Sequence, residues 1–348
     1  MTNTPGNTTV LVTGGTGFVG IHCIIQLLQQ GYMVKTTIRA LKNKEKVTRM
    51  LINNGITIFD KLSFIEADLT SDINWDKAVA GCAYVLHVAS PIGIPNPKSD
   101  DDFIKPAVDG TLRVLKAAKN AGVKRVVLTS SFGAVGYTYT NAHKPITEEN
   151  WTDLNDKTLS GYLRSKTLAE MAAWDFIKGE GKGLELAVIN PAGIFGPTPG
   201  PDLSGGLQII CGLLNGAIKA TPNISFGIVD VRDVADLHLR AMVNPKANGE
   251  RFLALADEVL RFHDIAILLR NKLGDRAKNV TTKVMPDWLM RVLALFNPSF
   301  KDIVAQLGRN KNASNEKAKK LLGWTPRSHE EAILASAESL FRFGLIKK

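Results

Sequence analysis

Tyr162 and Lys166 are two side chains whose types and spacing could carry out chemistry together. They lie four residues apart in the segment Tyr-Leu-Arg-Ser-Lys, within a helical pattern, so both face the same side of the predicted helix. A phenol can protonate a carbonyl oxygen as the carbon receives a hydride, and we expect a nearby ammonium to lower the phenol pKa from its ordinary value of about 10. Because such pairs also arise by chance in helices, the surrounding sequence has to support this interpretation.

Two adjacent serines provide the first support. Ser130 and Ser131 follow Leu128-Thr129, where a predicted strand ends at the edge of a sheet on which doubly wound folds bind their ligands. A hydroxyl at this edge can polarise a substrate carbonyl. Neighbouring strand residues point to opposite faces, so periodicity alone allows either serine.

A glycine-rich segment from Thr13 to Gly20 follows the first predicted strand and opens a helix. Its spacing is Gly-x-x-Gly-x-x-Gly, at Gly14, Gly17 and Gly20. Glycines allow close backbone approach, and the amide groups and dipole at the start of a helix favour a diphosphate there. The segment predicts a dinucleotide site.

The second predicted strand ends in Thr37-Ile38-Arg39, without the carboxylate that NAD-binding proteins usually place on the ribose 2′-hydroxyl. Arg39 could instead bind a 2′-phosphate and stack on adenine, and Lys46 lies at the start of a predicted helix. The positive charge at this position therefore predicts NADPH/NADP+ as the cofactor. Asp68, after the third strand, could accept from the adenine amino group or cap the next turn.

The elements that must position these groups alternate along the chain. Long amphipathic stretches separate short apolar strands, which predicts an α/β Rossmann-like doubly wound parallel sheet. The expected strands are Thr9 to Thr13, Val34 to Ile38, Ser63 to Glu66, Tyr84 to His87, Arg125 to Thr129, Glu185 to Ile189 and Ser225 to Val229. Glycine and proline between Pro191 and Gly216 predict a loop region, and a helix is expected from near Val231.

This pattern predicts two units. Residues 1–190 with about 219–245 would form the NADP(H)-binding domain, and about 191–218 with 246–348 a smaller, mostly helical substrate-binding domain. Helices are expected at Asn315 to Leu322 and His329 to Phe343, on either side of a Gly-Trp-Thr-Pro turn.

Composition narrows the class of protein. The formal net charge is +10, but the basic residues are spread along the chain and accompany no nucleic-acid-binding motif, so we expect no nucleic-acid partner. No apolar run is long enough for a membrane span, and Cys23, Cys82 and Cys211 show no paired spacing. We expect a cytoplasmic enzyme, monomeric or homodimeric, with no membrane partner and no metal, and with structural roles for His22, His87 and His238.

Several motifs in order resemble the extended short-chain dehydrogenases/reductases, and within them the dihydroflavonol reductase and yeast-type aldehyde and ketone reductase branch. The match runs from about residue 8 to residue 346. It rests on Gly14 to Gly20, Arg39, Asp68-Leu69, His87 to Pro91, Thr129 to Ser131, Tyr162 to Lys166, Asn190 to Pro197, Val229 to Ala235 and Leu322 to Trp324.

The resemblance implies reduction of a ketone or aldehyde by a Ser-Tyr-Lys mechanism, and its Thr-Ser-Ser pattern selects Ser131 over Ser130. It also implies that Lys46 shares the 2′-phosphate with Arg39. The expected cofactor-binding residues are Gly14, Thr16, Gly17, Phe18, Val19, Gly20, Arg39, Lys46, Asp68, Leu69, Val88, Ala89, Ser90, Tyr162, Lys166, Pro191, Gly193, Ile194 and Ser204.

The substrate is less closely defined. Gly136 and Gly227 stand where plant flavonoid reductases carry asparagine and glutamine, and the segment before Tyr162 lacks the cinnamoyl-CoA reductase signature. Aromatic residues near the site favour a hydrophobic or aromatic carbonyl substrate, although each could equally pack in the core: Phe132, Tyr137, Tyr139, Phe195 and Phe226. The alternatives are an NAD-dependent sugar-nucleotide epimerase or dehydratase and a non-catalytic NADP(H)-sensing protein.

Overall fold

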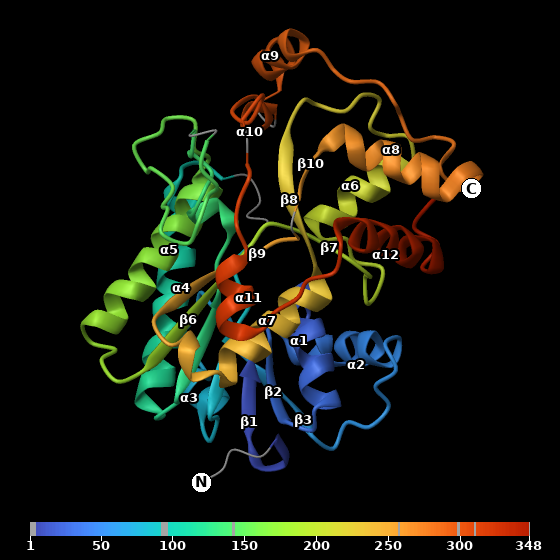
Figure 1. Cartoon of the computed structure of the whole chain (residues 1–348). Coiled ribbons are helices and arrows are strands. Elements are labelled where there is room, and N and C mark those ends of the chain that lie inside the picture. The colour runs from blue at the N-terminus through green and yellow to red at the C-terminus, as the bar shows by residue number, and fades with distance from the viewer. Residues whose placement is uncertain are drawn as a thin grey trace.

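Seven parallel strands form the main sheet of the computed structural model, which describes residues 5–91, 97–140, 143–256, 258–297, 300–309 and 311–347 (Figure 1). Their spatial order is β3-β2-β1-β4-β5-β6-β9, with every neighbouring pair parallel. The strands are β1 (Thr9–Val12), β2 (Met33–Ile38), β3 (Leu62–Glu66), β4 (Tyr84–His87), β5 (Arg125–Thr129), β6 (Glu185–Pro191) and β9 (Glu250–Ala254). The expected Rossmann-like fold is confirmed.

Helices cover both faces of this sheet. Alternate strand residues point to opposite faces, so Val12 and Leu86 join one apolar cluster while Leu11 and Val85 join the other. The first cluster lies under α1 (Phe18–Gln29), α2 (Lys44–Ile52) and α7 (Val231–Val243). The second lies under α3 (Trp75–Val79), α4 (Asp101–Asn120) and α5 (Gly161–Lys178).

A smaller sheet lies beyond the carboxyl ends of the main strands, toward the upper right of Figure 1. Its order is β10-β8-β7, where β8 (Ser225–Asp230) runs parallel to β7 (Gly193–Phe195) and antiparallel to β10 (Val259–Arg261). It shares an apolar cluster with α6 (Gly205–Leu214), α8 (Phe262–Leu273) and α12 (His329–Arg342). The remaining helices are η1 (Pro5–Asn7), η2 (Leu41–Asn43), η3 (Phe132–Ala134), η4 (Pro245–Ala247), η5 (Gly274–Ala277), α9 (Asp287–Phe296), α10 (Lys301–Val304) and α11 (Glu316–Leu322).

Three parts of the sequence-based assignment need correction. The strand at 225–230 does not resume the main sheet but lies in the small one. The seventh main strand is β9, a strand that the sequence pattern did not predict in the otherwise mostly helical region after 245. The region from Pro191 to Gly216 is not all loop, because it contains β7 and α6.

The chain passes back to the main-sheet core at α11 and Trp324 before α12 returns to the small sheet. Trp324 is 1% exposed, and its indole nitrogen donates to the carbonyl oxygen of Asp233 at the start of α7, at 3.0 Å. Gly323 ends α11 with a φ of 60°, the left-handed conformation that glycine adopts readily. The expected turn therefore anchors the carboxyl-terminal segment against the main sheet unit.

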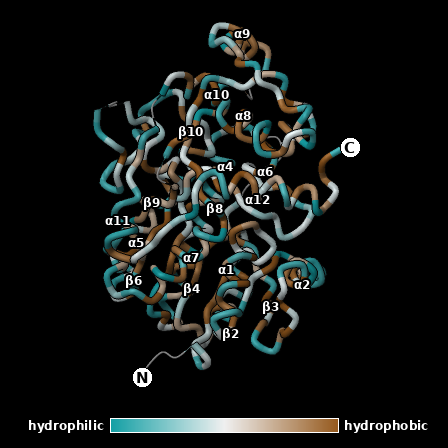
Figure 2. Tube along the Cα trace, turned by 45° about the vertical axis from the view of Figure 1, so that its right-hand side comes forward, coloured by the Kyte–Doolittle hydropathy of each residue, from teal (hydrophilic) through white to brown (hydrophobic). Residues whose placement is uncertain are grey.

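Helix α9 stands apart from the apolar core, at the top of Figures 1 and 2. It buries Met290 and Ala294 but leaves Trp288, Leu295 and Phe296 exposed. Over the described residues, no helix combines the length and apolar character needed to cross a bilayer.

Close backbone packing shapes the turn between β1 and α1. A Cβ added to Gly20 would lie 2.4 Å from the carbonyl oxygen of Gly14, and one added to Gly15 would lie 2.3 Å from Thr36 Oγ1. Gly14 itself has a φ of 76°. The glycines thus let α1 begin directly against the turn, which leaves the turn free to approach a ligand.

We expect Gly20→Ala to lower the free energy of unfolding by about 1–3 kcal/mol. The added methyl group would clash with the backbone carbonyl of Gly14, which cannot move away as a flexible side chain could. Gly205→Ala is the control, since a Cβ at this first residue of α6 meets nothing within 4 Å. Its effect should stay within about 0.5 kcal/mol. Urea denaturation of both variants measures the difference, and equal stability would contradict the packing argument.

Candidate active site

Thr13 connects the glycine turn to the end of β4. Its Oγ1 accepts from the backbone amides of Val88 and Ala89, both at 3.0 Å, and lies 2.9 Å from His87 Nδ1. Burial and the charge of Lys166 lower the His87 pKa to about 3, so the neutral ring can accept the remaining Thr13 proton. This arrangement holds the glycine turn beside Ala89, only 3.1 Å from where a Gly14 Cβ would be.

The expected adenosine-side residues lie at neighbouring strand ends. Arg39 is exposed after β2 and lies near enough to Asp68, after β3, to help lower the carboxyl pKa, although hydrogen bonds from Thr70 contribute more. Asp68 Oδ1 accepts from the Thr70 amide and hydroxyl at 2.8 and 2.7 Å, so it shapes the local turn. A hollow of about 620 Å³ beside Leu69 is lined by Pro91 and the first half of α4.

Lys46 lies at the first turn of α2, as expected, but it already has a partner. Its ammonium forms an ion pair with the carboxylate of Asp202, in the segment that follows β7. Both side chains are about half exposed.

The segment from Pro191 to Ser204 crosses the carboxyl edge of the sheet. Pro191 ends β6, while Gly193 and Ile194 form β7 and are half-buried. Ser204 precedes α6, and its Oγ is buried without a hydrogen-bond partner among the described residues. An unpaired buried hydroxyl at the start of a helix suits an anionic group, so this position fits the expected phosphates.

The turn residues of the expected site differ in exposure. Thr16 is half-buried and Gly17 exposed, whereas Val19 is buried inside α1. Phe18 packs against the apolar clusters of both units.

The two candidate serines have different environments. Ser130 is buried, and its hydroxyl donates to Glu170 Oε2 at 2.5 Å. Ser131 is half-buried, and its Oγ accepts from the Gly133 amide at 3.0 Å as it caps η3. Because the Ser130 hydroxyl is committed to a buried carboxylate, Ser131 is the one that can donate toward a substrate.

Tyr162 and Lys166 lie on one face of the first turns of α5, which packs against η3. Lys166 is 8% exposed, donates to Ser90 Oγ at 2.8 Å, and places its ammonium 5.7 Å from the Tyr162 ring centroid. Burial lowers the Lys166 pKa to about 8. Burial also raises the Tyr162 pKa above its ordinary value, whereas a nearby ammonium was expected to lower it.

A buried carboxylate lies behind these residues, one helical turn after Lys166. Glu170 accepts from Arg251 Nε at 2.6 Å and from Asn190 Nδ2 at 2.7 Å, in addition to Ser130. Asn190 Nδ2 also lies 3.2 Å from the Ser131 carbonyl oxygen. The group therefore joins α5 to the carboxyl ends of β5 and β6 and to the start of β9. No motif in the sequence marks this group, although the spacing of Glu170 from Lys166 places both on one face of α5.

The lone histidines have protein partners. His22 Nε2 donates to the Pro197 carbonyl oxygen at 3.0 Å, and His238 Nε2 lies 2.7 Å from Thr129 Oγ1. Burial lowers the pKa of each to about 4, so both rings are neutral. Over the described residues, no group of three or more histidine, cysteine or acidic side chains could hold a metal ion, and all three cysteines are free thiols.

The aromatic residues near the site divide into two groups. Phe195 is fully buried and stacks on Phe226 with ring centroids 6.3 Å apart, so it belongs to the small-unit core rather than to a pocket. Phe132 and Tyr139 are half-buried against a cluster that includes Ile146. Tyr137 is also half-buried, and its hydroxyl donates to the Asp302 carbonyl oxygen at 3.4 Å.

Gly136 and Gly227 both have close neighbours. A Cβ at Gly136 would lie 2.8 Å from side-chain atoms of both Ile146 and Phe132. At Gly227 it would lie 3.1 Å from the Ala192 Cβ. The space that a longer side chain would need at Gly136 is already filled by apolar groups.

Comparison with known proteins agrees with this geometry. The model of the NAD dependent epimerase/dehydratase family matches residues 10–254. The chain belongs to this family.

Two similar curated proteins are named reductases. Tetraketide alpha-pyrone reductase 2 of Arabidopsis thaliana is 35% identical over 268 residues, which cover 75% of this chain and 82% of the relative. Cinnamoyl-CoA reductase CAD2 of Medicago truncatula is 37% identical over 272 residues, or 75% and 79% of the two chains. This chain is thus an oxidoreductase of the NAD(P)H-dependent reductase type, as expected.

Solved structures resemble nearly the whole chain. The NADPH complex of Gre2 from Candida albicans is 30% identical, with a TM-score of 0.78 over 97% of this chain and 99% of that one. Yeast methylglyoxal/isovaleraldehyde reductase Gre2, also complexed with NADPH, is 27% identical, with a TM-score of 0.77 and the same coverage. The match to the expected yeast-type branch extends over both units.

We expect Arg251→Met to lower the free energy of unfolding by about 3–5 kcal/mol, because it leaves the Glu170 carboxylate buried without its cation. Adding Glu170→Gln removes that charge and should recover about 1–2 kcal/mol. Arg276→Met is the matched control, since its ion pair with Glu338 is half exposed, and it should cost about 1 kcal/mol or less. Urea denaturation measures all three variants. A double variant no more stable than Arg251→Met would contradict the buried-charge explanation.

Proposed function

We propose that this protein uses NADPH to reduce a ketone or aldehyde, most suitably a hydrophobic or aromatic one, to the alcohol. The observation that carries the proposal is the contact between Lys166 and Ser90. It joins the helix that bears Tyr162 to the strand end beside the glycine turn. A proton donor and a dinucleotide site thus meet at one edge of the main sheet, where doubly wound folds bind ligands.

The proposed cofactor site follows that edge. Gly14 to Gly20 would receive the diphosphate together with the unpaired hydroxyl of Ser204. Arg39 would hold the 2′-phosphate with Lys46, while Asp68 and Leu69 would border the adenine. Val88, Ala89 and Ser90 would line the ribose, and Pro191, Gly193 and Ile194 the nicotinamide. The two NADPH complexes among the structural relatives support this assignment.

NADPH, when bound, supplies the hydride. In the proposed mechanism Tyr162 donates the proton to the carbonyl oxygen, and its raised pKa keeps the phenol protonated at neutral pH. Ser131 donates a hydrogen bond to the same oxygen and so favours charge development there. Lys166 is mostly protonated at pH 7, since its pKa is about 8, and its ammonium stabilises the phenolate as the proton leaves.

The two units would bind different parts of the reacting system. We propose that the main-sheet unit holds the cofactor, and that the small sheet with its helices covers the substrate. The aromatic side chains Phe132, Tyr137 and Tyr139 lie in the segment after Ser131, which supports an apolar substrate. We assign the enzyme to the cytoplasm, where its free thiols would remain reduced.

We expect Tyr162→Phe to lower kcat for carbonyl reduction by at least about a hundredfold, since it removes the proton donor. NADPH binding, followed by fluorescence titration, should change little. Tyr32→Phe, which removes the hydroxyl of a buried tyrosine directly before β2, is the matched control and should retain activity. The assay follows NADPH oxidation with aldehydes, β-keto esters and diketones. Activity surviving in Tyr162→Phe would overturn its role, and activity confined to sugar nucleotides would overturn the substrate class.

We expect Arg39→Asp to shift the kcat/KM preference from NADPH toward NADH, because a carboxylate repels a 2′-phosphate and accepts from a 2′-hydroxyl. Lys42→Asp makes the same charge change at a nearby exposed position and should leave the preference nearly unchanged. Steady-state kinetics with both cofactors give the ratio. If Arg39→Asp did not alter it, the proposed basis of cofactor choice would be wrong.

A further inference from the structure

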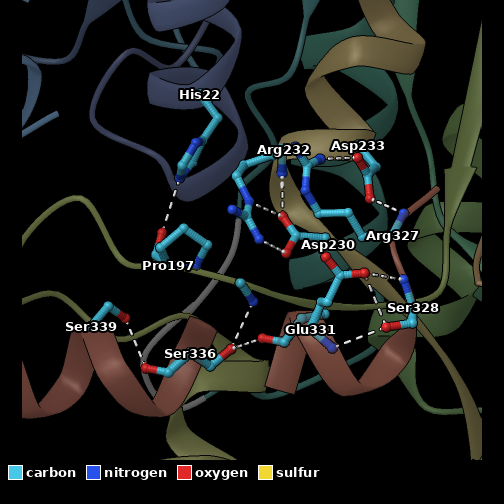
Figure 3. Close-up of polar contacts among 12 residues, drawn as sticks. His22, Pro197, Asp230, Arg232, Asp233, Arg327, Ser328, Glu331, Ser336 and Ser339 are labelled. Atoms are coloured by element: carbon cyan, nitrogen blue, oxygen red, sulfur yellow. Dashed lines mark hydrogen bonds and ion pairs between the residues drawn. The ribbon is translucent and has the colours of Figure 1, made fainter. Parts of the chain in front are cut away.

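The segment Pro197–Asp202 bridges the cofactor unit and the carboxyl-terminal helix. On one side, the Thr198 amide donates to Ser339 Oγ at 2.9 Å, so the segment is attached to α12. On the other, the Pro197 carbonyl oxygen accepts from His22 of α1 at 3.0 Å (Figure 3). Contacts from two units thus determine where the first residues of the segment lie.

Further contacts attach the same segment to α2. Asn53 Nδ2 donates to the Pro199 carbonyl oxygen at 3.2 Å. Gly200 approaches Met50 closely enough that a Cβ there would lie 3.3 Å from its side chain. Asp202 is therefore held beside α2 by neighbouring residues, and its position does not depend on its own carboxylate.

That carboxylate neutralises one member of a basic group that extends from the residue after β2 through η2 and α2. This basic group consists of Arg39, Lys42, Lys44, Lys46 and Arg49. Over the described residues, Lys46 is the member with a carboxylate partner, Asp202 Oδ2. The Lys46 ammonium thus faces a negative group before any phosphate arrives.

We propose that Asp202 is a specificity-determining residue that weakens binding of 2′-phosphorylated cofactor by competing for Lys46. This inference rests on the proposed NADPH function and deepens it. A 2′-phosphate near Lys46 would meet the Asp202 carboxylate as a like charge and would have to share the ammonium with it. A 2′-hydroxyl carries no charge, so the same carboxylate would leave NADH binding nearly unaffected.

Asp202 would thereby lower the affinity of the enzyme for its cofactor. NADP+ carries the same 2′-phosphate as NADPH, so Asp202 would weaken the binding of both forms. Exchange of oxidised for reduced cofactor after each turnover would then be faster than with an unopposed Lys46.

The test measures binding and needs no turnover. We expect Asp202→Asn, which has nearly the same shape, to lower the Kd for NADPH about two- to fivefold, the range of a partly exposed ion pair. The Kd for NADH should stay within about 1.5-fold, and the gain for NADPH should shrink in 0.5 M NaCl because salt screens exposed charges. Glu338→Gln, which removes another half-exposed acidic partner far along α12, is the control and should change neither.

A second pair of variants isolates the competition. In a Lys46→Met background, Asp202→Asn should have much less effect on NADPH binding, because the contested ammonium is gone. Equal tightening in both backgrounds, weaker NADPH binding in Asp202→Asn, or equal changes for NADPH and NADH would each overturn the inference. These results would leave the reductase proposal standing. A wild-type chain that did not bind NADPH at all would instead contradict the proposed function itself.

Discussion

The buried carboxylate of Glu170 holds together the elements that carry the proposed catalytic groups. Its oxygens accept from Ser130, Asn190 and Arg251, which belong to or directly follow three different strands of the main sheet, and from Trp174 on its own helix. A carboxylate inside a protein is stable only when such donors surround it. The requirement therefore fixes α5 against the carboxyl ends of β5 and β6 and the start of β9. Tyr162 and Lys166 are held on the same helix, and Ser131 follows the serine that serves the network.

A second polar group joins the two units. Asp230 is fully buried at the start of α7, where its carboxylate accepts from the amide and guanidinium of Arg232 (Figure 3). The neighbouring Asp233 accepts from the Arg327 amide at 2.7 Å, and Ser336 Oγ of α12 accepts from the Gly196 amide at the same distance. These contacts place the carboxyl-terminal helix against the segment that contains β7. The proposed nicotinamide and phosphate contacts thus depend on residues far along the chain.

Local patterns predicted most of the main sheet because its central strands are short apolar runs between turns. Local patterns did not predict β9, because the charged residues Glu250 and Arg251 interrupt its apolar run. Arg251 is nevertheless buried, where it forms an ion pair with Glu170. Strand periodicity could not decide between Ser130 and Ser131 as the residue that faces the substrate. Their hydroxyls differ because Ser130 donates to Glu170, a partner 40 residues along the chain. The Tyr162 pKa differs from the expected lowering for a related reason, since burial raises it and burial depends on the whole fold. No local signal connects Lys46 with Asp202.

The interleaving of the two units has a consequence for synthesis on the ribosome. Strand β6 ends at Pro191, yet its outer neighbour β9 begins only at Glu250, after β7, α6, β8 and α7 have been made. Until then the nascent chain carries β6 as an unpaired edge, the kind of surface that recruits other strands and promotes aggregation. The main sheet therefore lacks its last strand until the chain beyond Glu250 has been made. Folding of the two units is therefore coupled in time.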